Sequence, residues 1–401
     1  MDRQIFHSSP DQAVPEDRAL EDAPSEDSYP AKKSLRIGVD ARPLSFPHSG
    51  IGQYLHALLK ILLPATTGRV RWYLYSDRCL PEDFPLHDSV LRCGSNSSRL
   101  LSTGFAQCYF GRWAKADQLD VFWSPRHQLP VSLSRKIRSV VTLHDLVFET
   151  HPQTMTGSGR TLERLLTPRS LKAADAIITT SKSVLSELTA YNAELPPKTR
   201  VIPLSSNIAD FSTTERAITL PARPYILFCG STEPRKNLNR LLRSFVRLHA
   251  EPSPPPQRLV IVSGGGWKDA TTKAIMDEHH AMVEIHRNVT EAQKAALLRN
   301  ADFLVLPSLT EGFGIPLVEA QKLAIPILTS NTGAMPEVAR EAARYVDPYD
   351  ENSITNALRE MCMNAGLRER LSANARLQAD DFNWQRSAMA TLEVLQSAAT
   401  H

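Results

Sequence analysis

Two glutamates, Glu311 and Glu319, flank a glycine-rich turn that reads Glu311-Gly-Phe-Gly-Ile-Pro-Leu-Val-Glu319. An apolar run at residues 303–306 predicts a strand before the turn. Helical spacing follows at 316–323, where Pro316 suits the first helical position. Glycines can expose backbone amides, and a helix N-terminus stabilises a phosphate. One carboxylate could bind sugar hydroxyls and the other ribose hydroxyls. Two glutamates at this spacing could be chance, but the same spacing around Gly-Phe-Gly-x-Pro is much more specific.

A second strand-to-helix turn carries two adjacent cations, Arg235 and Lys236. It follows an apolar run at 225–229 and precedes a predicted helix at 237–250. Cations at the carboxyl end of a parallel strand are placed to hold a diphosphate, with Arg binding in a bidentate manner and Lys acting as a point charge. The alternative is a solvated charge pair without a ligand.

Polar side chains also end two predicted strands in the first half of the chain. His144 and Asp145 follow the strand at 139–143, and Arg126 and His127 follow the strand at 121–123. Parallel sheets bind ligands at the carboxyl ends of their strands. In the alternative interpretation, Asp145 caps a turn and His144 fills a polar gap. The second polar strand end weakens this alternative.

The first predicted strand, at 35–39, leads into a loop with Gly50 and Gly52 and then into an amphipathic helix. Glycines at a helix N-terminus let the backbone approach an anion closely. The third glycine of the G-x-G-x-x-G fingerprint is missing because position 55 is Leu, so we do not expect a dinucleotide site. A plain tight turn and a ligand loop both fit these residues.

These motifs lie in two successive series of expected strands and helices. The first series comprises strands at 35–39, 71–75, 121–123, 139–143, 176–179 and 200–202. The second comprises strands at 225–229, 258–262, 282–285, 303–306, 326–329 and 344–346, with helices near 237–250, 291–299, 316–323, 335–342 and 352–365. This alternation predicts an α/β protein with two doubly wound, Rossmann-like domains whose parallel sheets face each other across a cleft.

The charge of the chain is unevenly distributed. Residues 1–30 hold eight acidic and two basic side chains, so they sum to −6, and the remainder of a chain with net charge +3 sums to +9. This segment is poor in large apolar groups, so we expect a disordered acidic tail at 1–34. The domains expected after it are residues 35–208 and 224–381, joined by a polar linker at 209–223.

Composition excludes several classes of protein. With 42% hydrophobic and 22% charged residues, the chain is not collagenous, coiled-coil or wholly disordered. No apolar run approaches the ~18 residues of a membrane span, and the first residues do not resemble a secretion signal. Five cysteines without a C-x-x-C spacing indicate reduced thiols. We therefore expect a cytoplasmic enzyme, at most peripheral at the inner membrane face.

From about Leu35 to Trp384 the sequence resembles a known family, the retaining GT-B glycosyltransferases of family 4. It looks closest to bacterial mannosyl- and rhamnosyltransferases of surface polysaccharide assembly. Chance agreement at all the matching segments, in order, is remote. They are Ile37-Gly-Val-Asp-Ala-Arg42 with Ser49-Gly-Ile-Gly52, Thr142-Leu-His-Asp-Leu146, Ala174-Asp-Ala-Ile-Ile-Thr-Thr-Ser181, Glu233-Pro-Arg-Lys-Asn237, and Glu311 to Glu319. Phe382-Asn-Trp384 resembles the point from which a C-terminal helix, residues 382–401, crosses back to the first domain.

The resemblance implies a role for each motif. The first domain would lie on the acceptor side, with Asp145, Arg126 and His127, and the second would bind the donor. Catalytic residues would be Glu311, His144, Lys236 and Arg235. Donor-binding residues would be Gly50, Gly52, Gly230, Ser231, Arg235, Lys236, Gly312, Phe313, Gly314, Ile315 and Glu319. By this resemblance His144 contacts the donor sugar, Arg235 and Lys236 neutralise the diphosphate, and Glu319 binds the ribose.

Two positions depart from the family pattern. Many relatives carry Arg where this chain has Ser231, and Arg235 would supply that charge. Asn237 replaces a glycine that is common after the lysine. We expect a nucleoside-diphosphate sugar as donor, with GDP as the nucleotide, and no cofactor or metal, because no D-x-D sequence stands at a strand end.

Alternative functions remain open at this stage. One is a nucleotide-sugar epimerase or hydrolase of the same fold, and another is a non-catalytic nucleotide-sugar-binding scaffold. The basic residues are dispersed, so nucleic acid is not expected as a partner. A basic and aromatic stretch at 99–115, together with Arg135, Lys136 and Arg138, could contact an anionic membrane. The alternative for this stretch is a core helix with solvated cationic ends.

Overall fold

The computed structural model describes residues 34–47, 49–81, 83–94, 101–211, 219–264 and 270–400. Residues Leu35–His401 form one compact unit. The acidic segment 1–34, expected to be disordered, lies outside the described residues except for Ser34. Residues 212–218 of the expected linker also lie outside them.

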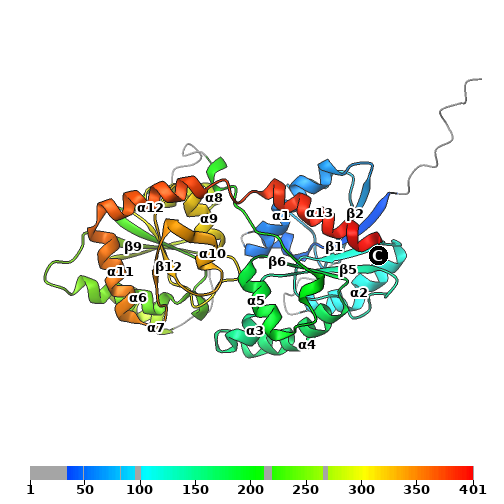
Figure 1. The fold of residues 1–401 in the computed structure, drawn as a ribbon, viewed down its shortest axis with the longest axis horizontal. Helices are drawn as coiled ribbons and strands as arrows, with labels where there is room; N and C mark the ends of the chain where they lie inside the picture. The colour runs from blue at the N-terminus through cyan, green and yellow to red at the C-terminus, as the bar shows by residue number, and fades with distance from the viewer. Residues whose placement is uncertain are drawn as a thin grey trace, which may run out of the picture. The chain divides into compact units, whose positions relative to one another are not determined.

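A seven-stranded parallel sheet occupies the first half of this unit, in the order β3-β2-β1-β4-β5-β6-β7. Its strands read as short apolar, β-branched or aromatic runs because helices cover both faces. Figure 1 shows α1 and α13 on one face and α2, α4 and α5 on the other. The strands are β1 (Leu35–Asp40), β2 (Val70–Ser76), β3 (Val90–Cys93), β4 (Val121–Ser124), β5 (Arg138–Leu143), β6 (Ala176–Thr179) and β7 (Thr199–Val201).

The helices of this half are amphipathic or short. Ser49 begins α1 by accepting a hydrogen bond from the backbone N–H of Gly52, and Ser181 begins α5 in the same way through Val184. The helices are α1 (Gly50–Ala65), α2 (Ser102–Ala116), α3 (Val147–Thr150), α4 (Gly157–Ala173) and α5 (Lys182–Tyr191).

A six-stranded parallel sheet follows, in the order β10-β9-β8-β11-β12-β13. Its strands are β8 (Tyr225–Cys229), β9 (Arg258–Ser263), β10 (Val283–Arg287), β11 (Leu304–Leu306), β12 (Ile327–Ser330) and β13 (Ala343–Val346). The helices are α6 (Leu238–His249), α7 (Ala270–Glu278), α8 (Glu291–Arg299), α9 (Ile315–Lys322), α10 (Met335–Ala339), α11 (Glu351–Met363) and α12 (Ala365–Gln378). In Figure 1, α9 and α12 cover one face and α6, α7 and α11 the other.

Strand order reverses once in each sheet, between β1 and β4 in the first and between β8 and β11 in the second. Loops that leave neighbouring strands in opposite directions open a crevice at such a point, where doubly wound sheets bind ligands. The loops after β8 and β11 carry the basic turn and the glutamate motif. The segment after β1 leads into Gly50 and Gly52 at the start of α1, and the loop after β4 carries Arg126 and His127.

The last helix, α13 (Trp384–Thr400), packs against α1, β4, β5 and β6 of the first sheet. Ser387 Oγ donates to the carbonyl of Pro203 at 2.6 Å, and Arg200 pairs with Glu393 at 2.8 Å. The boundaries between the expected domains remain a prediction.

The two-sheet architecture predicted from the sequence is confirmed, and several elements match in their bounds. The expected strand at 225–229 and helix at 291–299 are β8 and α8. Strand β3 was not predicted from the sequence; its four residues lie at the edge of the sheet and none of them is buried. An edge strand buries little, so its sequence carries little signal.

Candidate functional site

Glu311 lies at the centre of a buried charge cluster formed by the loops after β8 and β11. Lys236 Nζ donates to Glu311 Oε1 at 2.6 Å, and Arg235 Nη1 donates to Oε2 at 2.7 Å. Ser308 Oγ also donates to Oε1, at 2.6 Å. Burial opposes the carboxylate charge, but the two cations lower the pKa of Glu311 to about 2. The structure thus brings three of the four predicted catalytic residues together.

The two cations differ in how many hydrogen bonds they make to other described residues. Arg235 also donates to the carbonyl of Thr310 at 2.9 Å, and its own carbonyl accepts from Leu309 at 2.8 Å. Arg235 therefore braces the loop after β11. Within the described residues Lys236 makes only its bond to Glu311, which leaves two of its three ammonium hydrogens for a ligand. A Cβ on Gly230 would lie 3.7 Å from Lys236 Cδ, so the lysine side chain passes this glycine, next to Ser231.

Two residues in left-handed backbone conformations shape these loops. Asn237 has φ 61° and ψ 26°, and its side chain donates to the carbonyls of Pro307 and Pro348. Asparagine tolerates this conformation and adds these bonds, which explains how it replaces glycine here. Gly314 has φ 92° and directly precedes α9, so the turn needs a glycine before Ile315 begins the helix.

His144 follows β5 and is held from two sides. Its Nε2 lies 3.0 Å from the carbonyl of Pro125, and the edge of its ring meets Tyr54 with centroids 5.0 Å apart. A carbonyl only accepts, so we assign the ring proton to Nε2. Burial lowers the pKa of His144 to about 4. A neutral ring with an unprotonated Nδ1 accepts a hydrogen bond from a sugar hydroxyl but is not an acid at neutral pH.

His127 supports His144 through the backbone. The N–H of His144 donates to His127 Nε2 at 3.1 Å, which requires a lone pair there, and His127 Nδ1 lies 3.5 Å from Glu163. Burial opposes the charge of His127, but Glu163 raises the pKa of His127. In return, burial of Glu163 is outweighed mainly by His127, which lowers the pKa of Glu163 to about 2. We assign the His127 proton to Nδ1, because the bond from His144 occupies Nε2.

Gly312 makes a direct contact between segments of the two sheets. A Cβ at this position would lie 1.7 Å from the carbonyl oxygen of His144, so no other residue fits without displacing the backbone. The Gly312 carbonyl accepts from Ser181 Oγ at 2.8 Å and from Thr180 Oγ1 at 3.1 Å. The glutamate motif and the His144 strand end, predicted separately, therefore meet.

The two glycines of the first loop have different surroundings. A Cβ on Gly52 would lie 2.2 Å from the carbonyl oxygen of Phe46, so close backbone packing alone requires this glycine. A Cβ on Gly50 would meet no described atom within 4 Å. Gly50, at the first position of α1, therefore has open space on the side where a Cβ would lie.

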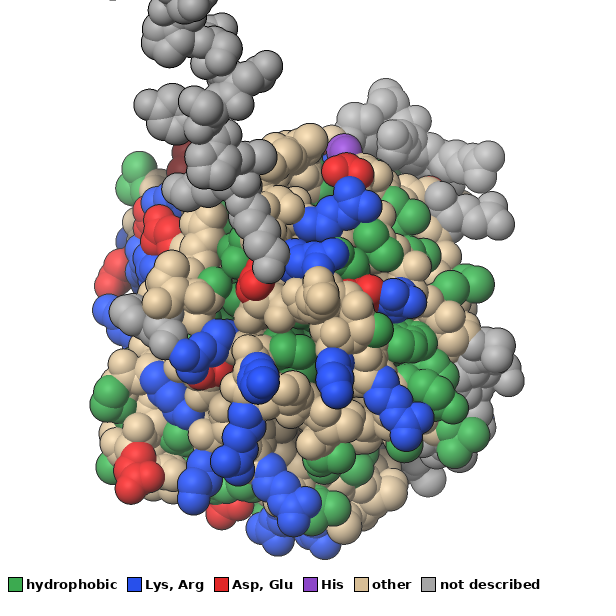
Figure 2. Space-filling view, turned by 90° about the vertical axis from the view of Figure 1, so that its right-hand side faces the viewer, with side chains coloured by type: hydrophobic (Ala, Val, Ile, Leu, Met, Phe, Trp, Pro, Cys, Tyr) green, Lys and Arg blue, Asp and Glu red, His purple; other side chains and the backbone are tan. Residues whose placement is uncertain are grey.

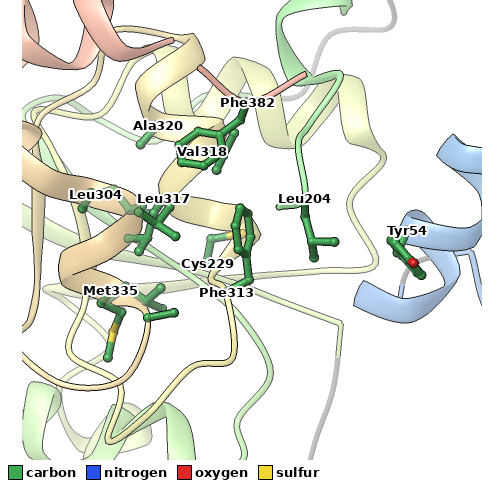
Figure 3. Packing of buried hydrophobic residues seen from close by; sticks show 14 of the residues in the cluster. Tyr54, Leu204, Cys229, Leu304, Phe313, Leu317, Val318, Ala320, Met335 and Phe382 are labelled. Atoms are coloured by element: carbon green, nitrogen blue, oxygen red, sulfur yellow. The ribbon is translucent and has the colours of Figure 1, made fainter. Parts of the chain in front are cut away.

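Phe313 belongs to the core instead of lining an open pocket. Its side chain is 5% exposed and meets Phe382 edge to face with centroids 5.5 Å apart. Figure 3 shows Phe313 among Leu204, Cys229 and Phe382. Its contribution to a donor site would come through its backbone.

Glu319 forms a second charge cluster, separate from that of Glu311. Its Oε1 accepts from Lys294 Nζ at 2.6 Å, and the same ammonium lies 2.8 Å from Glu291. Burial raises the pKa of Glu319, against the attraction of Lys294. Glu291 in turn accepts from Gln53 of α1 at 3.1 Å.

The remaining acceptor-side residues, Asp145 and Arg126, differ from each other. Asp145 Oδ1 accepts from the backbone N–H of Val147 at 3.2 Å at the start of α3, as the turn-capping alternative expects. The Arg126 guanidinium has no hydrogen bond or ion pair to any described residue. Burial and the neighbouring Arg42 lower its pKa.

Sequence reasoning missed Lys294, Glu291, Glu163 and Tyr54. Lys294 stands in a helix with an ordinary charge pattern, and nothing local marks it as buried. Ser181 had a signal, because the matched segment Ala174-Asp-Ala-Ile-Ile-Thr-Thr-Ser181 ends on it. Its role became clear only from its bond to Gly312.

Comparison with known families identifies the chain. A model described as Glycosyltransferase Family 4 matches residues 49–206, and a model described as Glycosyl transferases group 1 matches residues 212–378. Together they match most of the chain. The chain belongs to the family 4 glycosyltransferases. It is therefore an enzyme of a retaining glycosyltransferase family.

Two relatives give the family match more detail. The O-antigen chain mannosyltransferase B of Escherichia coli is 26% identical over 89% of this chain and 98% of its own length. An MMP alpha-(1->4)-mannosyltransferase of Mycolicibacterium hassiacum is 30% identical over 55% of this chain. The chain spans 54% of the length of that second relative.

Solved structures support the fold. A sucrose-phosphate synthase from Thermosynechococcus elongatus matches with a TM-score of 0.70 and 19% identity over 90% of this chain and 98% of its own. The Anabaena protein Alr3699/HepE, in complex with UDP and glucose, matches with a TM-score of 0.67 and 16% identity over 91% of this chain and 100% of its own. This glycosyltransferase has the GT-B fold, which implies a nucleotide-sugar donor. None of the helices in the described part of the chain is long and apolar enough to cross a membrane.

Proposed function

We propose that this glycosyltransferase transfers mannose or rhamnose from a nucleoside-diphosphate sugar to a saccharide or lipid-linked saccharide during surface polysaccharide assembly. The donor part of this proposal rests on one observation. Lys236 and Arg235 both bind the Glu311 carboxylate at the point where the strand order of the second sheet reverses. The choice of mannose and of a polysaccharide acceptor is supported by similarity to the O-antigen mannosyltransferase. GDP is the nucleotide we expect.

On the donor side, Lys236 would carry the diphosphate and Arg235 would hold the loop that receives it. Glu311 pairs with both cations and Glu233 lies 3.6 Å from Arg235, so Lys236 is the cation that keeps free hydrogens for the leaving group. The open amides around Gly314 and Ile315 begin α9 and add further N–H donors. Preorganised positive charge aimed at a leaving group is often the largest catalytic contribution. These residues would supply it without a metal ion.

We propose retention through attack on the same face of the sugar. The bond between the anomeric carbon and the β-phosphate oxygen breaks, and the leaving phosphate takes the electron pair. The acceptor hydroxyl forms the new bond, and a phosphate oxygen takes its proton. Neutral His144 would accept a hydrogen bond from a donor-sugar hydroxyl through Nδ1 and so orient the sugar.

On the acceptor side, we propose that Arg126 binds a phosphate group that the acceptor carries, with His127 and Asp145 beside it. The carboxylates that act on this guanidinium electrostatically already have partners, since Asp40 binds Arg42, Glu163 pairs with His127 and Asp77 pairs with Arg78. A poorly solvated guanidinium without a protein acceptor is costly unless a ligand completes it. A lipid-linked diphosphate saccharide would provide that anion.

Incubation of the purified protein with GDP-mannose or GDP-rhamnose and a synthetic mannoside acceptor tests the function. We expect a disaccharide product whose new linkage keeps the donor's anomeric configuration by NMR. Donor incubated alone should stay mostly intact, and conversion of donor without acceptor would favour the epimerase or hydrolase. The Glu311→Ala variant should abolish transfer. Polysaccharide synthesis that continues in cells carrying this variant would favour the scaffold.

We also propose a peripheral contact with an anionic membrane. Figure 2 shows a face on which Lys and Arg outnumber Asp and Glu. Helix α2 buries Phe110 and Ala114 and exposes Arg112 and Lys115, so it is a core helix with cationic residues on its outer side. Such cations attract anionic lipid headgroups at about 1 kcal/mol each. Residues 99 and 100, which begin the stretch at 99–115, lie outside the described residues.

A further inference from the structure

Lys294 is a buried lysine of α8 that no motif of the donor site includes. Its side chain is 9% exposed, and its ammonium lies between two carboxylates, 2.6 Å from Glu319 and 2.8 Å from Glu291. Burial works against this charge, yet the neighbouring carboxylates raise the pKa of Lys294. Two carboxylates share one ammonium, so the cluster carries an excess negative charge when all three groups are ionised.

Only one of the two carboxylate oxygens of Glu319 accepts a hydrogen bond from a described residue. Oε1 accepts from Lys294, whereas Oε2 has no hydrogen bond from any described residue. An ionised carboxylate accepts at both oxygens, so Oε2 can take hydrogen bonds from donors of a ligand. Hydroxyl groups of a ligand would supply donors to Oε2 and spread the excess negative charge of the cluster.

The cluster is also anchored on the side away from Glu319. Glu291 Oε1 accepts from Gln53 Nε2 of α1 at 3.1 Å, while Oε2 faces Lys294. Glu291 therefore fixes the ammonium from the opposite side. Lys294 is held in one place, and it fixes the orientation of the Glu319 carboxylate.

We propose that Lys294 is a positioning residue for nucleotide recognition, which turns Glu319 Oε2 toward the ribose hydroxyls of the donor. This inference rests on the proposed function, because it needs a nucleoside-diphosphate donor, and it takes Glu319 as the ribose ligand that the family resemblance implies. It adds that Lys294, which need not touch the nucleotide, sets the preference for a nucleotide with both ribose hydroxyls.

This role is tested by comparing the affinities of two nucleotides for the wild type and two Lys294 variants. Isothermal titration would measure the dissociation constants of GDP and 2′,3′-dideoxy-GDP for the wild type, Lys294→Met and Lys294→Arg. The wild type should bind GDP about 10- to 100-fold more tightly than the dideoxy compound, the range for hydrogen bonds to a charged group. Lys294→Met should lose most of this preference while its affinity for dideoxy-GDP stays within about threefold of wild type. Lys294→Arg, which keeps the charge and so protects the fold, should keep only part of the preference.

A merely structural lysine would weaken both nucleotides equally, so equal loss in a folded variant would overturn the proposal. Full preference in either folded variant would overturn it too. A control is Glu278→Gln, at an exposed position of α7 without an ion pair to any described residue, which should keep the preference. If the wild type binds GDP without preferring it over the dideoxy compound, the ribose role of Glu319 is wrong. If the wild type binds neither GDP nor UDP, the proposed donor itself is wrong.

Discussion

Replacing Glu311 by Gln removes the negative charge that joins Lys236 and Arg235 while keeping the shape of the side chain. The pKa of Glu311 is about 2 in the folded protein, against an ordinary value of 4.5. Each pKa unit corresponds to about 1.4 kcal/mol, so ionised Glu311 contributes about 3 kcal/mol to the free energy of unfolding at neutral pH. We expect Glu311→Gln to lower that free energy by this amount at pH 7.

The pH dependence of this loss makes the prediction specific. A lowered folded-state pKa gives stability that is fully present above pH 4.5 and is lost as the pH falls toward 2. The difference between wild type and Glu311→Gln should therefore shrink to about 1 kcal/mol at pH 3. Urea unfolding followed by tryptophan fluorescence at pH 7, 5, 4 and 3 measures it. The matched control is Glu369→Gln, at an exposed position of α12 without an ion pair to any described residue. A loss that does not change with pH would refute the account of a paired, ionised Glu311.

Three further predictions concern the first sheet. Because the pKa of His144 is about 4 and that of an unfolded histidine is 6.5, its neutral form stabilises the fold above pH 6.5. The wild type should lose up to about 3 kcal/mol more than His144→Gln between pH 6.5 and 4 in urea unfolding, and parallel curves would contradict a buried neutral ring. Arg126→Gln should raise the KM of a mannoside acceptor linked through a diphosphate to an undecyl chain about 10-fold or more, but not that of the matching undecyl ether. An equal effect on both acceptors would remove the phosphate role. The fraction of protein that sediments with phosphatidylglycerol vesicles should decrease with added salt and in a variant with Arg112 and Lys115 changed to Gln. Vesicle binding that changes with neither would contradict the membrane contact.

Sequence patterns predicted the architecture because each buried parallel strand is a short apolar run. The segment at 225–229 and the helix at 291–299 match the structure for this reason. The edge strand β3 escaped prediction because its side chains are only partly buried. Periodicity reports burial, so it fails where burial is weak.

The site was predicted less completely, since its chemistry depends on contacts between distant segments. Glu311, Lys236 and Arg235 were found because each follows a buried strand and stands in a recognisable turn. Lys294 was not found, because its role depends on Glu319, 25 residues further along the chain. Gly52 illustrates a different limit. The sequence marked Gly52 as a residue that could let the backbone approach an anion. In the structure, a side chain at this position would collide with the carbonyl of Phe46.

In the proposed function Lys236 carries the leaving diphosphate during transfer, and kcat for sugar transfer from GDP-mannose in Lys236→Met tests this role most directly. Removing one preorganised charge of this kind costs about 10²- to 10³-fold in kcat. We expect a loss in that range for Lys236→Met, while Lys273→Met, on the exposed side of α7, should transfer at the wild-type rate. A folded Lys236→Met variant that keeps the wild-type kcat would contradict it.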